Sequence, residues 1–219
     1  MSRVSQSLIE LLNNLPISLW GVSDISESNK FKTKYTSAIS LAQGYSYTLD
    51  DYSSTNFNDF LLGQVKVKLE DNIDIIKKFL EEENIAYHIV SNIQEDPILS
   101  IGEFSQKFAA LNAGLGWIGK NGLLITEEYG PRVRLFTILV DLDLPFNTSE
   151  TLNGCGDCTI CVKACPTKCL KGATWNSELD RGDIIDVFNC NDKNETRKGH
   201  ICALCSIGKS IDNKNRLVK

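Results

Sequence analysis

The first 154 residues of this 219-residue chain contain no cysteine, and all eight cysteines lie between Cys155 and Cys205. A disulfide-stabilised secreted domain spreads its cysteines through a short chain, so this distribution argues against one. The N-terminus mixes polar residues and an acid with its apolar residues and has no small-residue cleavage site, which predicts no signal peptide. No apolar run approaches the roughly 18 residues that a membrane helix needs. We therefore expect a cytoplasmic protein without membrane association.

Positive charge is also scarce. The chain has 23 Lys and Arg against 28 Asp and Glu, a formal net charge of −5. Binding to nucleic acid depends on Lys and Arg that neutralise phosphates, so nucleic acid is not an expected partner. The 42% of hydrophobic residues can build a proper core. The length allows one large domain, or a medium domain with a small appendage.

Four of the cysteines form the motif Cys155-x2-Cys158-x2-Cys161-x3-Cys165-Pro166. This spacing is typical of a bacterial-type ferredoxin, in which the first three thiolates bind one iron–sulfur cluster and the fourth binds a second cluster. Zinc is the alternative, although zinc usually takes Cys-x2-Cys pairs separated by a longer spacer. Eight thiols meet the ligand demand of two [4Fe–4S] clusters. The predicted metal ligands are Cys155, Cys158, Cys161, Cys165, Cys169, Cys190, Cys202 and Cys205.

The segment before the cysteines mixes helical and strand patterns. Apolar residues three or four positions apart predict helices over 2–15 and from 60 to 83, with a shorter helix over 104–111. Short apolar stretches predict strands at 17–22, 38–42, 87–90, 123–126 and 133–142, the last two joined by a turn at 127–131, and the polar stretch 50–58 predicts a loop. The pattern lacks the regular alternation of a doubly wound sheet, which favours an α+β fold.

The composition changes between residues 145 and 154. The cysteine-bearing part that follows has few apolar residues and cannot build a core alone, so its stability must come largely from bound clusters. We predict a cofactor or substrate domain over 1–148 and a double-cluster ferredoxin-like domain over 149–219.

A glycine-rich segment lies between a predicted helix and a predicted strand. Its spacing Gly114-x-Gly116-x2-Gly119 formally matches a dinucleotide fingerprint, but that fingerprint follows a strand and opens a helix, the reverse of the order here. Two interpretations remain open. The segment is a tight turn with Trp117 as a core anchor, or it is a backbone wall against a flat cofactor or the cluster domain, with Lys120 near an anion. The predicted cofactor-binding residues are Gly114, Gly116, Trp117, Gly119 and Lys120.

The run from Ala113 to Leu142, AGLGWIGKNGLLITEEYGPRVRLFTILVDL, followed by the four-cysteine motif, resembles the epoxyqueuosine reductase family and its short iron–sulfur relatives. The resemblance implies a nitroreductase-like, cobalamin-reductase-like α+β domain followed by a two-cluster ferredoxin-like module. It implies a reductase that passes electrons through the clusters to a corrinoid (cobalamin), with a flavin as the alternative cofactor. A reduced ferredoxin or flavodoxin would donate the electrons. A small-molecule substrate or a redox partner protein would receive them.

The chain departs from the family pattern in three places. It ends soon after Cys205, without the helical-repeat domain of the enzymes that act on transfer RNA, which argues against that substrate. The family carries a proton-donating Asp in the segment that is comparable to residues 90–94 of this chain. This stretch has no acid here, and the nearest one, Asp96, is a poor match. The catalytic residue therefore stays unknown. The family's distal Cys-x2-Cys-x3-Cys-Pro has Lys209 in place of its third cysteine.

The resemblance also implies a division of the ligands. The family pattern gives the second cluster Cys165, Cys190, Cys202 and Cys205, and elimination leaves Cys169 as the fourth ligand of the first cluster. A helix that starts at Pro166 would instead bring Cys169 close to the second cluster. The open alternatives are a non-helical turn, a crossover by Cys190 or Cys205, a non-cysteine ligand, or a Cys169 that is a small buried residue. The rival to a reductase is a ferredoxin-like electron-transfer accessory protein without a catalytic site of its own.

Overall fold

The computed structural model of the chain describes residues 1–25, 31, 34–45, 57–91, 94–96, 101–146 and 154–192. The chain forms two compact units. Unit 1 comprises Met1–Ser91, Phe104–Leu115 and Arg134–Glu150, and unit 2 comprises Asn92–Glu103, Gly116–Val133 and Thr151–Lys219. The predicted boundary between residues 148 and 149 lies outside the described residues and stays a prediction.

Unit 1 is built around a four-stranded sheet with the order β1-β2-β8-β3. Its strands are β1 (Leu19–Asp24), β2 (Ser37–Gly44), β3 (Tyr87–Ile89) and β8 (Val133–Val140), the last of which begins at the edge of unit 2. β1 pairs antiparallel with β2, with Val22 opposite Ile39. β3 pairs antiparallel with β8, with His88 opposite Leu139.

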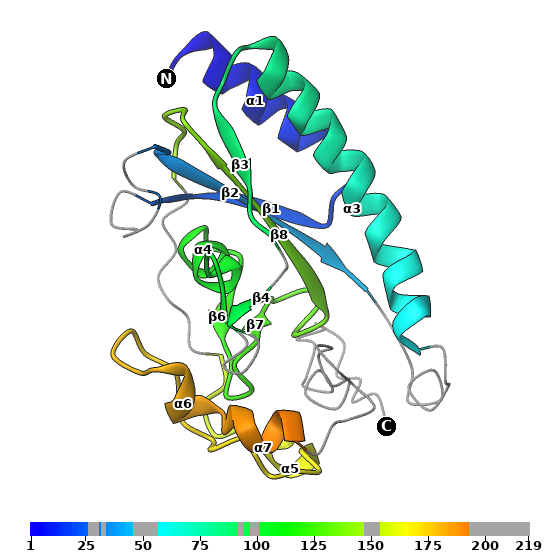
Figure 1. Cartoon of the computed structure of the whole chain (residues 1–219), viewed down its shortest axis with the longest axis vertical. Coiled ribbons are helices and arrows are strands. Elements are labelled where there is room, and N and C mark those ends of the chain that lie inside the picture. The colour runs from blue at the N-terminus through cyan, green and yellow to red at the C-terminus, as the bar shows by residue number, and fades with distance from the viewer. Residues whose placement is uncertain are drawn as a thin grey trace. The chain divides into compact units, whose positions relative to one another are not determined.

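Helices lie on both faces of this sheet (Figure 1). On one face α1 (Arg3–Asn14) and α3 (Phe57–Glu82) pack together and against β2. On the other face α4 (Gln106–Asn112) contacts β1 and β2. Successive strand residues point to opposite faces of a sheet, so Ile39 and Leu41 join the core under α1 and α3 while Ala38 packs with α4. The core of unit 1 is therefore two layers of apolar side chains, one on each face of the sheet.

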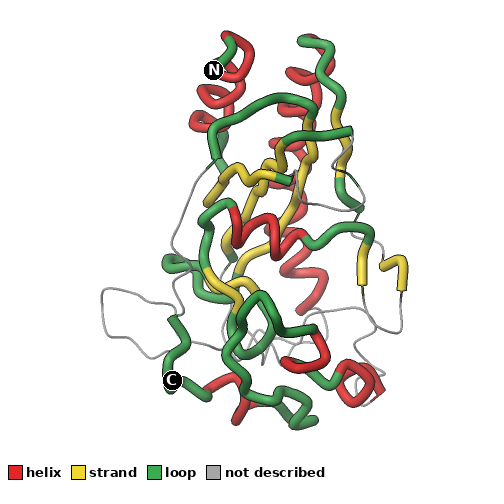
Figure 2. Tube along the Cα trace, turned by 90° about the vertical axis from the view of Figure 1, so that its left-hand side faces the viewer, coloured by secondary structure: helices red, strands yellow, loops and turns green. Residues whose placement is uncertain are grey.

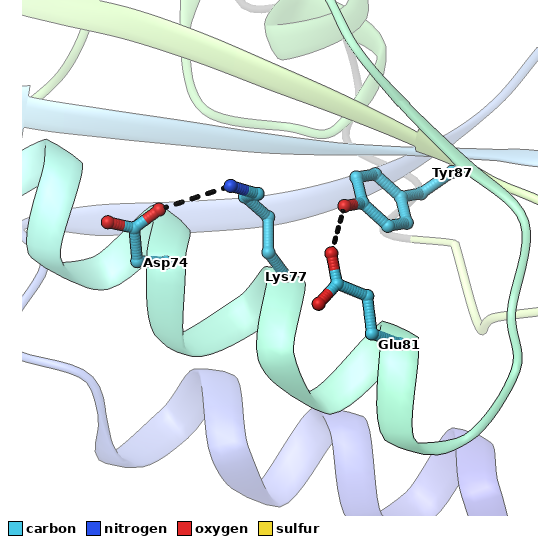
Figure 3. Close-up of polar contacts among 4 residues, drawn as sticks. All are labelled: Asp74, Lys77, Glu81 and Tyr87. Atoms are coloured by element: carbon cyan, nitrogen blue, oxygen red, sulfur yellow. Dashed lines mark hydrogen bonds and ion pairs between the residues drawn. The ribbon is translucent and has the colours of Figure 1, made fainter.

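The end of α3 is tied to the start of β3 by polar contacts (Figure 3). The Tyr87 hydroxyl donates a 2.7 Å hydrogen bond to the Glu81 carboxylate. One face of α3 also carries an exposed ion pair, Lys77 Nζ to Asp74 Oδ1 at 3.4 Å. Glu81 is in the last turn of α3 and Tyr87 is the first residue of β3, so their hydrogen bond spans the connection between helix and strand.

Unit 2 has shorter elements, and Figure 2 shows the cysteine-bearing segment mostly as loop with short helical turns. Two small antiparallel pairs join β4 (Gln94–Asp96) to β5 (Ile101–Gly102) and β6 (Trp117–Ile118) to β7 (Leu124–Ile125). After the cysteine motif begins, the helices are α5 (Ile160–Ala164), α6 (Arg181–Ile184) and α7 (Val187–Asp192).

The helices and strands predicted for unit 1 are confirmed within a few residues at their ends. The predicted strands at 123–126 and 133–142 exist as β7 and β8, but they belong to different sheets, because β7 pairs with β6 across the glycine-rich turn. The predicted loop at 50–58 lies outside the described residues up to residue 56, and α3 already begins at Phe57. In the described part of the chain, no helix is both long and apolar enough to cross a lipid bilayer.

Candidate metal centre

The glycine-rich segment closes on itself as a tight turn between β6 and β7. The Gly119 N–H donates to the Leu123 carbonyl at 2.9 Å, and the Gly122 N–H donates to the Gly119 carbonyl at 2.8 Å. A Cβ added at Gly116 would overlap the carbonyl oxygen of Ile125. A Cβ at Gly119 would lie 2.8 Å from a side-chain carbon of Ile125. Both positions require glycine, because the opposite strand of the same turn fills the space that a side chain would occupy.

Trp117 connects this turn to the cysteine segment. Its side chain is buried, and a Cβ added at Gly154 would lie 2.5 Å from the Cζ2 carbon of its indole ring. Gly154 immediately precedes Cys155, so the ring packs against the residue that leads into the cysteine motif. The indole Nε1 is buried and has no hydrogen-bond partner among the described residues. A buried donor of this kind requires an acceptor.

Lys120 makes a second connection within unit 2. Its side chain is buried, with 8% of its surface exposed, and its Nζ donates a 2.7 Å hydrogen bond to the carbonyl oxygen of Gly156. Gly156 lies in the turn that joins Cys155 to Cys158, and the Cys158 N–H donates to the Cys155 carbonyl at 2.8 Å across it. The ammonium group thus fixes the loop between the first two cysteines of the motif.

The first three cysteines of the motif are half-buried, and Cys155 and Cys158 both interact electrostatically with Cys161. Burial raises the pKa of the Cys161 thiol, and negative charge on Cys155 and on Cys158 raises this pKa further. Three thiolates that repel each other need a cation in their midst, and the iron atoms of a cluster supply that charge. The donor chemistry of this group therefore fits an iron–sulfur cluster.

A second group consists of Cys165, Cys169 and Cys190. Cys165 and Cys169 are buried with their sulfur atoms 3.4 Å apart, and they pack in one apolar cluster with Leu170 and with half-buried Cys190. Negative charge on Cys190 acts on Cys169, so all three thiols are within electrostatic reach. Cys161 also contacts this apolar cluster, which makes it the point where the two groups meet.

The two buried sulfurs have opposite protonation preferences. Burial raises the pKa of Cys165, but hydrogen bonds from Thr167 and Cys169, through side chains and backbone N–H groups, lower this pKa to about 7 overall. Burial raises the pKa of Cys169, and the neighbouring Cys165 and Cys190 sulfurs add to this effect and bring it to about 12. Of the two sulfurs, Cys165 therefore loses its proton more readily than Cys169.

The structure brings six of the eight predicted ligands into these two groups, whereas Cys202 and Cys205 lie outside the described residues. No three His, Cys, Asp or Glu side chains of the described ranges converge on a point suited to a single metal ion. The predicted cofactor-binding role of the glycine-rich segment stays a prediction. Sequence reasoning missed Thr167 and Gly154. A hydroxyl two residues after a cysteine of the motif, and a glycine just before the first one, were the available signals.

No protein-family model matches the chain. An epoxyqueuosine reductase of Aliivibrio fischeri is 31% identical over 148 residues, which are 67% of this chain and 36% of that protein. The structure of epoxyqueuosine reductase from Streptococcus thermophilus aligns with a TM-score of 0.55 at 22% identity, over 80% of this chain and 55% of that chain. A reductive dehalogenase, whose structure suggests a mechanism for B12-dependent dehalogenation, aligns with a TM-score of 0.58 at 16% identity, over 75% of this chain and 25% of that chain.

The family resemblance stated from the sequence is confirmed by these homologues. The mixed α and β architecture is also confirmed, and it is shared with epoxyqueuosine reductase and reductive dehalogenase structures. The ferredoxin-like build of the cysteine segment stays a prediction. The chain spans about a third of the length of the curated relative and about half of the solved one.

Proposed function

We propose that this chain, a homologue of epoxyqueuosine reductases that matches part of their length, is an iron–sulfur oxidoreductase. In this proposal two [4Fe–4S] clusters in the cysteine segment carry electrons, one at a time, to a cofactor or substrate held by residues 1–148. The observation that carries it is the division of the six described cysteines into two groups that meet at Cys161. In a two-cluster ferredoxin, the first three cysteines of the motif bind one cluster and the fourth cysteine binds the other.

The first cluster would be held by Cys155, Cys158 and Cys161. Two features of the surrounding residues support its presence. The Lys120 ammonium at Gly156 brings positive charge to a site where a cluster with thiolate ligands carries net negative charge. The buried indole N–H of Trp117 has no acceptor among the residues that the structure describes, and cluster sulfurs accept such hydrogen bonds. When bound, the cluster supplies reversible one-electron chemistry.

The second cluster would be held by Cys165 and Cys190 together with Cys202 and Cys205. Support comes from the burial of Cys165 and from its hydrogen bonds, which favour the thiolate that iron requires. A reduced ferredoxin or flavodoxin would supply the electrons. A small-molecule substrate or a redox partner protein would consume them.

A corrinoid is the proposed electron acceptor, with a flavin as the alternative. Its support is the fold shared with a reductive dehalogenase that is described as B12-dependent. The described residues do not add to that support. Gly116 and Gly119, which were predicted to face a cofactor, have their open sides filled by Ile125, and Gly122 has its open side filled by Ile185. We therefore assign no residue to the corrinoid.

The filled space beside these glycines favours a second candidate function. If the glycine-rich turn serves only to pack Trp117 and Lys120 against the cysteine segment, the chain is an electron carrier for another protein and needs no cofactor besides its clusters. In that case residues 1–148 would provide a docking surface for the redox partner.

The proposal is tested on the full chain, purified without oxygen. We expect about eight irons and eight sulfides per chain and a broad absorption near about 400 nm. About four irons would contradict the two-cluster proposal. Cobalamin titration of the reduced protein, followed by the visible spectrum, separates the two candidate functions, because only the reductase binds it. Cys158→Ser should lose the iron of one cluster and leave unit 1 resistant to protease, since that unit builds its own core.

A further inference from the structure

The segment from Cys165 to Cys169 is a tight turn that brings its two end residues together. The Lys168 N–H donates to the Cys165 carbonyl at 3.2 Å, and Lys168 has a positive φ of 53°, which turns the chain back. The Cys169 sulfur lies 3.4 Å from the Cys165 sulfur, and the Thr167 hydroxyl oxygen lies 3.5 Å from it. Thr167 and Cys169 are both buried. Two buried groups that can donate a hydrogen bond therefore face the Cys165 sulfur.

Cys169 is fixed in this position by its backbone. Its carbonyl accepts the Asp186 N–H at 2.9 Å, Leu170 bridges to Ile185, and the Lys171 N–H donates to the Ile184 carbonyl at 3.0 Å. Leu170 and Ile185 also pack against the cysteines. Because Cys169, Leu170 and Lys171 are paired with residues 184–186, the backbone of Cys169 cannot move away from Cys165 without breaking this ladder.

The distance between the two sulfurs is that of a hydrogen bond. Two cysteines that ligate the same [4Fe–4S] cluster bind different irons, and the width of the cluster keeps their sulfurs farther apart than this. A thiol and a thiolate in contact form an S–H···S⁻ bond, which is strengthened because the acceptor is charged. The geometry therefore fits one ligand with a donor beside it, and it does not fit two ligands of one cluster.

We propose that Cys169 is not a cluster ligand but a thiol that donates a hydrogen bond to the ligand Cys165 and thereby, together with the Thr167 hydroxyl, raises the reduction potential of the second cluster. Reduction adds one electron and makes the sulfur ligands more negative, so donors aimed at a ligand stabilise the reduced cluster more than the oxidised one. Cys169 and Thr167 are positioning and tuning residues.

This inference rests on the proposed function, because Cys165 must ligate a cluster for its neighbours to tune it. It differs from the ligand count reached by elimination, in which Cys169 completes the first cluster. The backbone N–H groups of Thr167 and Cys169 also act on Cys165 and are retained when either side chain is replaced. Side-chain substitutions therefore remove one donor at a time and leave the rest of the turn in place.

The test compares the full chain with Cys169→Ala, Cys169→Ser and Thr167→Val under anaerobic conditions. Thr159→Val is the matched control, because Thr159 begins α5 without a side-chain capping bond and lies outside this turn. Iron and sulfide per chain are measured first, and the potentials of both clusters are then measured by redox titration followed by EPR. We expect all four variants to keep the iron content of the unchanged protein.

Cys169→Ala and Thr167→Val should each shift one cluster to a lower potential and leave the other where it was. Cys169→Ser, which restores a donor, should give an intermediate shift, and Thr159→Val should give none in that cluster. Loss of iron or a three-iron EPR signal in Cys169→Ala would identify Cys169 as a ligand and overturn the inference. Full iron with unchanged potentials in Cys169→Ala and Thr167→Val would also overturn it.

Two further outcomes are decisive. If Cys169→Ala does not fold, Thr167→Val and Cys169→Ser test the same cluster, and unchanged potentials in both would contradict the tuning role. A full chain that binds no iron would overturn the proposed function and this inference together. Normal iron in the full chain together with unchanged potentials in the variants would overturn the inference alone.

Discussion

The Lys120 ammonium donates a 2.7 Å hydrogen bond to the carbonyl oxygen of Gly156, the residue that follows Cys155. The side chain of Lys120 is buried, so this bond compensates for the removal of a cation from water. It links the glycine-rich turn to the loop between two predicted cluster ligands. Lys120 is thus the point at which the two sequence motifs of the chain meet within one structural unit.

Lys120→Met should weaken the first cluster site. A hydrogen bond from a charged group contributes about 1.5–3 kcal/mol, so we expect the free energy of unfolding to fall by about that amount. The variant should also lose iron faster when a chelator is added. Lys163→Met is the control, because Lys163 lies in the same segment with an exposed side chain. Equal rates of iron loss in the two variants would contradict the role given to Lys120.

Gly154→Ala should disturb the packing between Trp117 and the start of the cysteine motif. The added methyl group would lie 2.5 Å from the indole ring, and overpacking of this kind costs about 1–3 kcal/mol. Gly182→Ala is the control, because a Cβ there meets nothing within 4 Å. Adding Trp117→Phe to Gly154→Ala removes the ring atoms involved, so a thermal-unfolding cycle should show that the double variant loses less than the sum of the single ones.

Gly116→Ala separates internal packing from cofactor binding. Its methyl group would overlap the Ile125 carbonyl, a backbone atom that cannot rotate away, so we expect a loss of about 3 kcal/mol in the free energy of unfolding. Gly63→Ala, in the open on α3, should instead gain about 0.5–1 kcal/mol, since alanine favours helix. A Gly116→Ala protein of normal stability that no longer binds cobalamin would show that Gly116 faces a cofactor.

The Tyr87–Glu81 hydrogen bond predicts a dependence of stability on pH. The bond to Glu81, followed by burial and by the Glu81 charge, raises the pKa of Tyr87 above 10. A raised pKa in the folded state gives stability that is complete below the unfolded pKa of about 10 and is lost as the pH rises through the folded value. Chemical unfolding should therefore show Tyr87→Phe less stable than the unchanged protein at pH 8, by about 1 kcal/mol or less. The difference should shrink above pH 10, and a constant difference would contradict this account.

The long helices of unit 1 could be predicted because each buries a single face, and β2 could be predicted because it is a short apolar stretch buried on both faces. The spacing of Leu8 and Leu12 shows the buried side of α1, and the alternation of Ala38 with Ile39 in β2 shows that both faces of the sheet are covered. β6 could not be predicted in this way. It is two residues long and flanked by glycines, and its partner β7 lies across the turn, so its pairing depends on contacts that no local periodicity records.

For the candidate site, the sequence alone predicts which residues are the iron ligands, because cysteine spacing is a property of the chain itself. It also indicated the family, since the motif from Ala113 to Leu142 is continuous. It could not determine which thiols share a group. The turn through Lys168 brings Cys169 to Cys165, and the pairing with 184–186 holds it there. That arrangement depends on residues distant in sequence, so only the tertiary structure could show that Cys169 lies against Cys165.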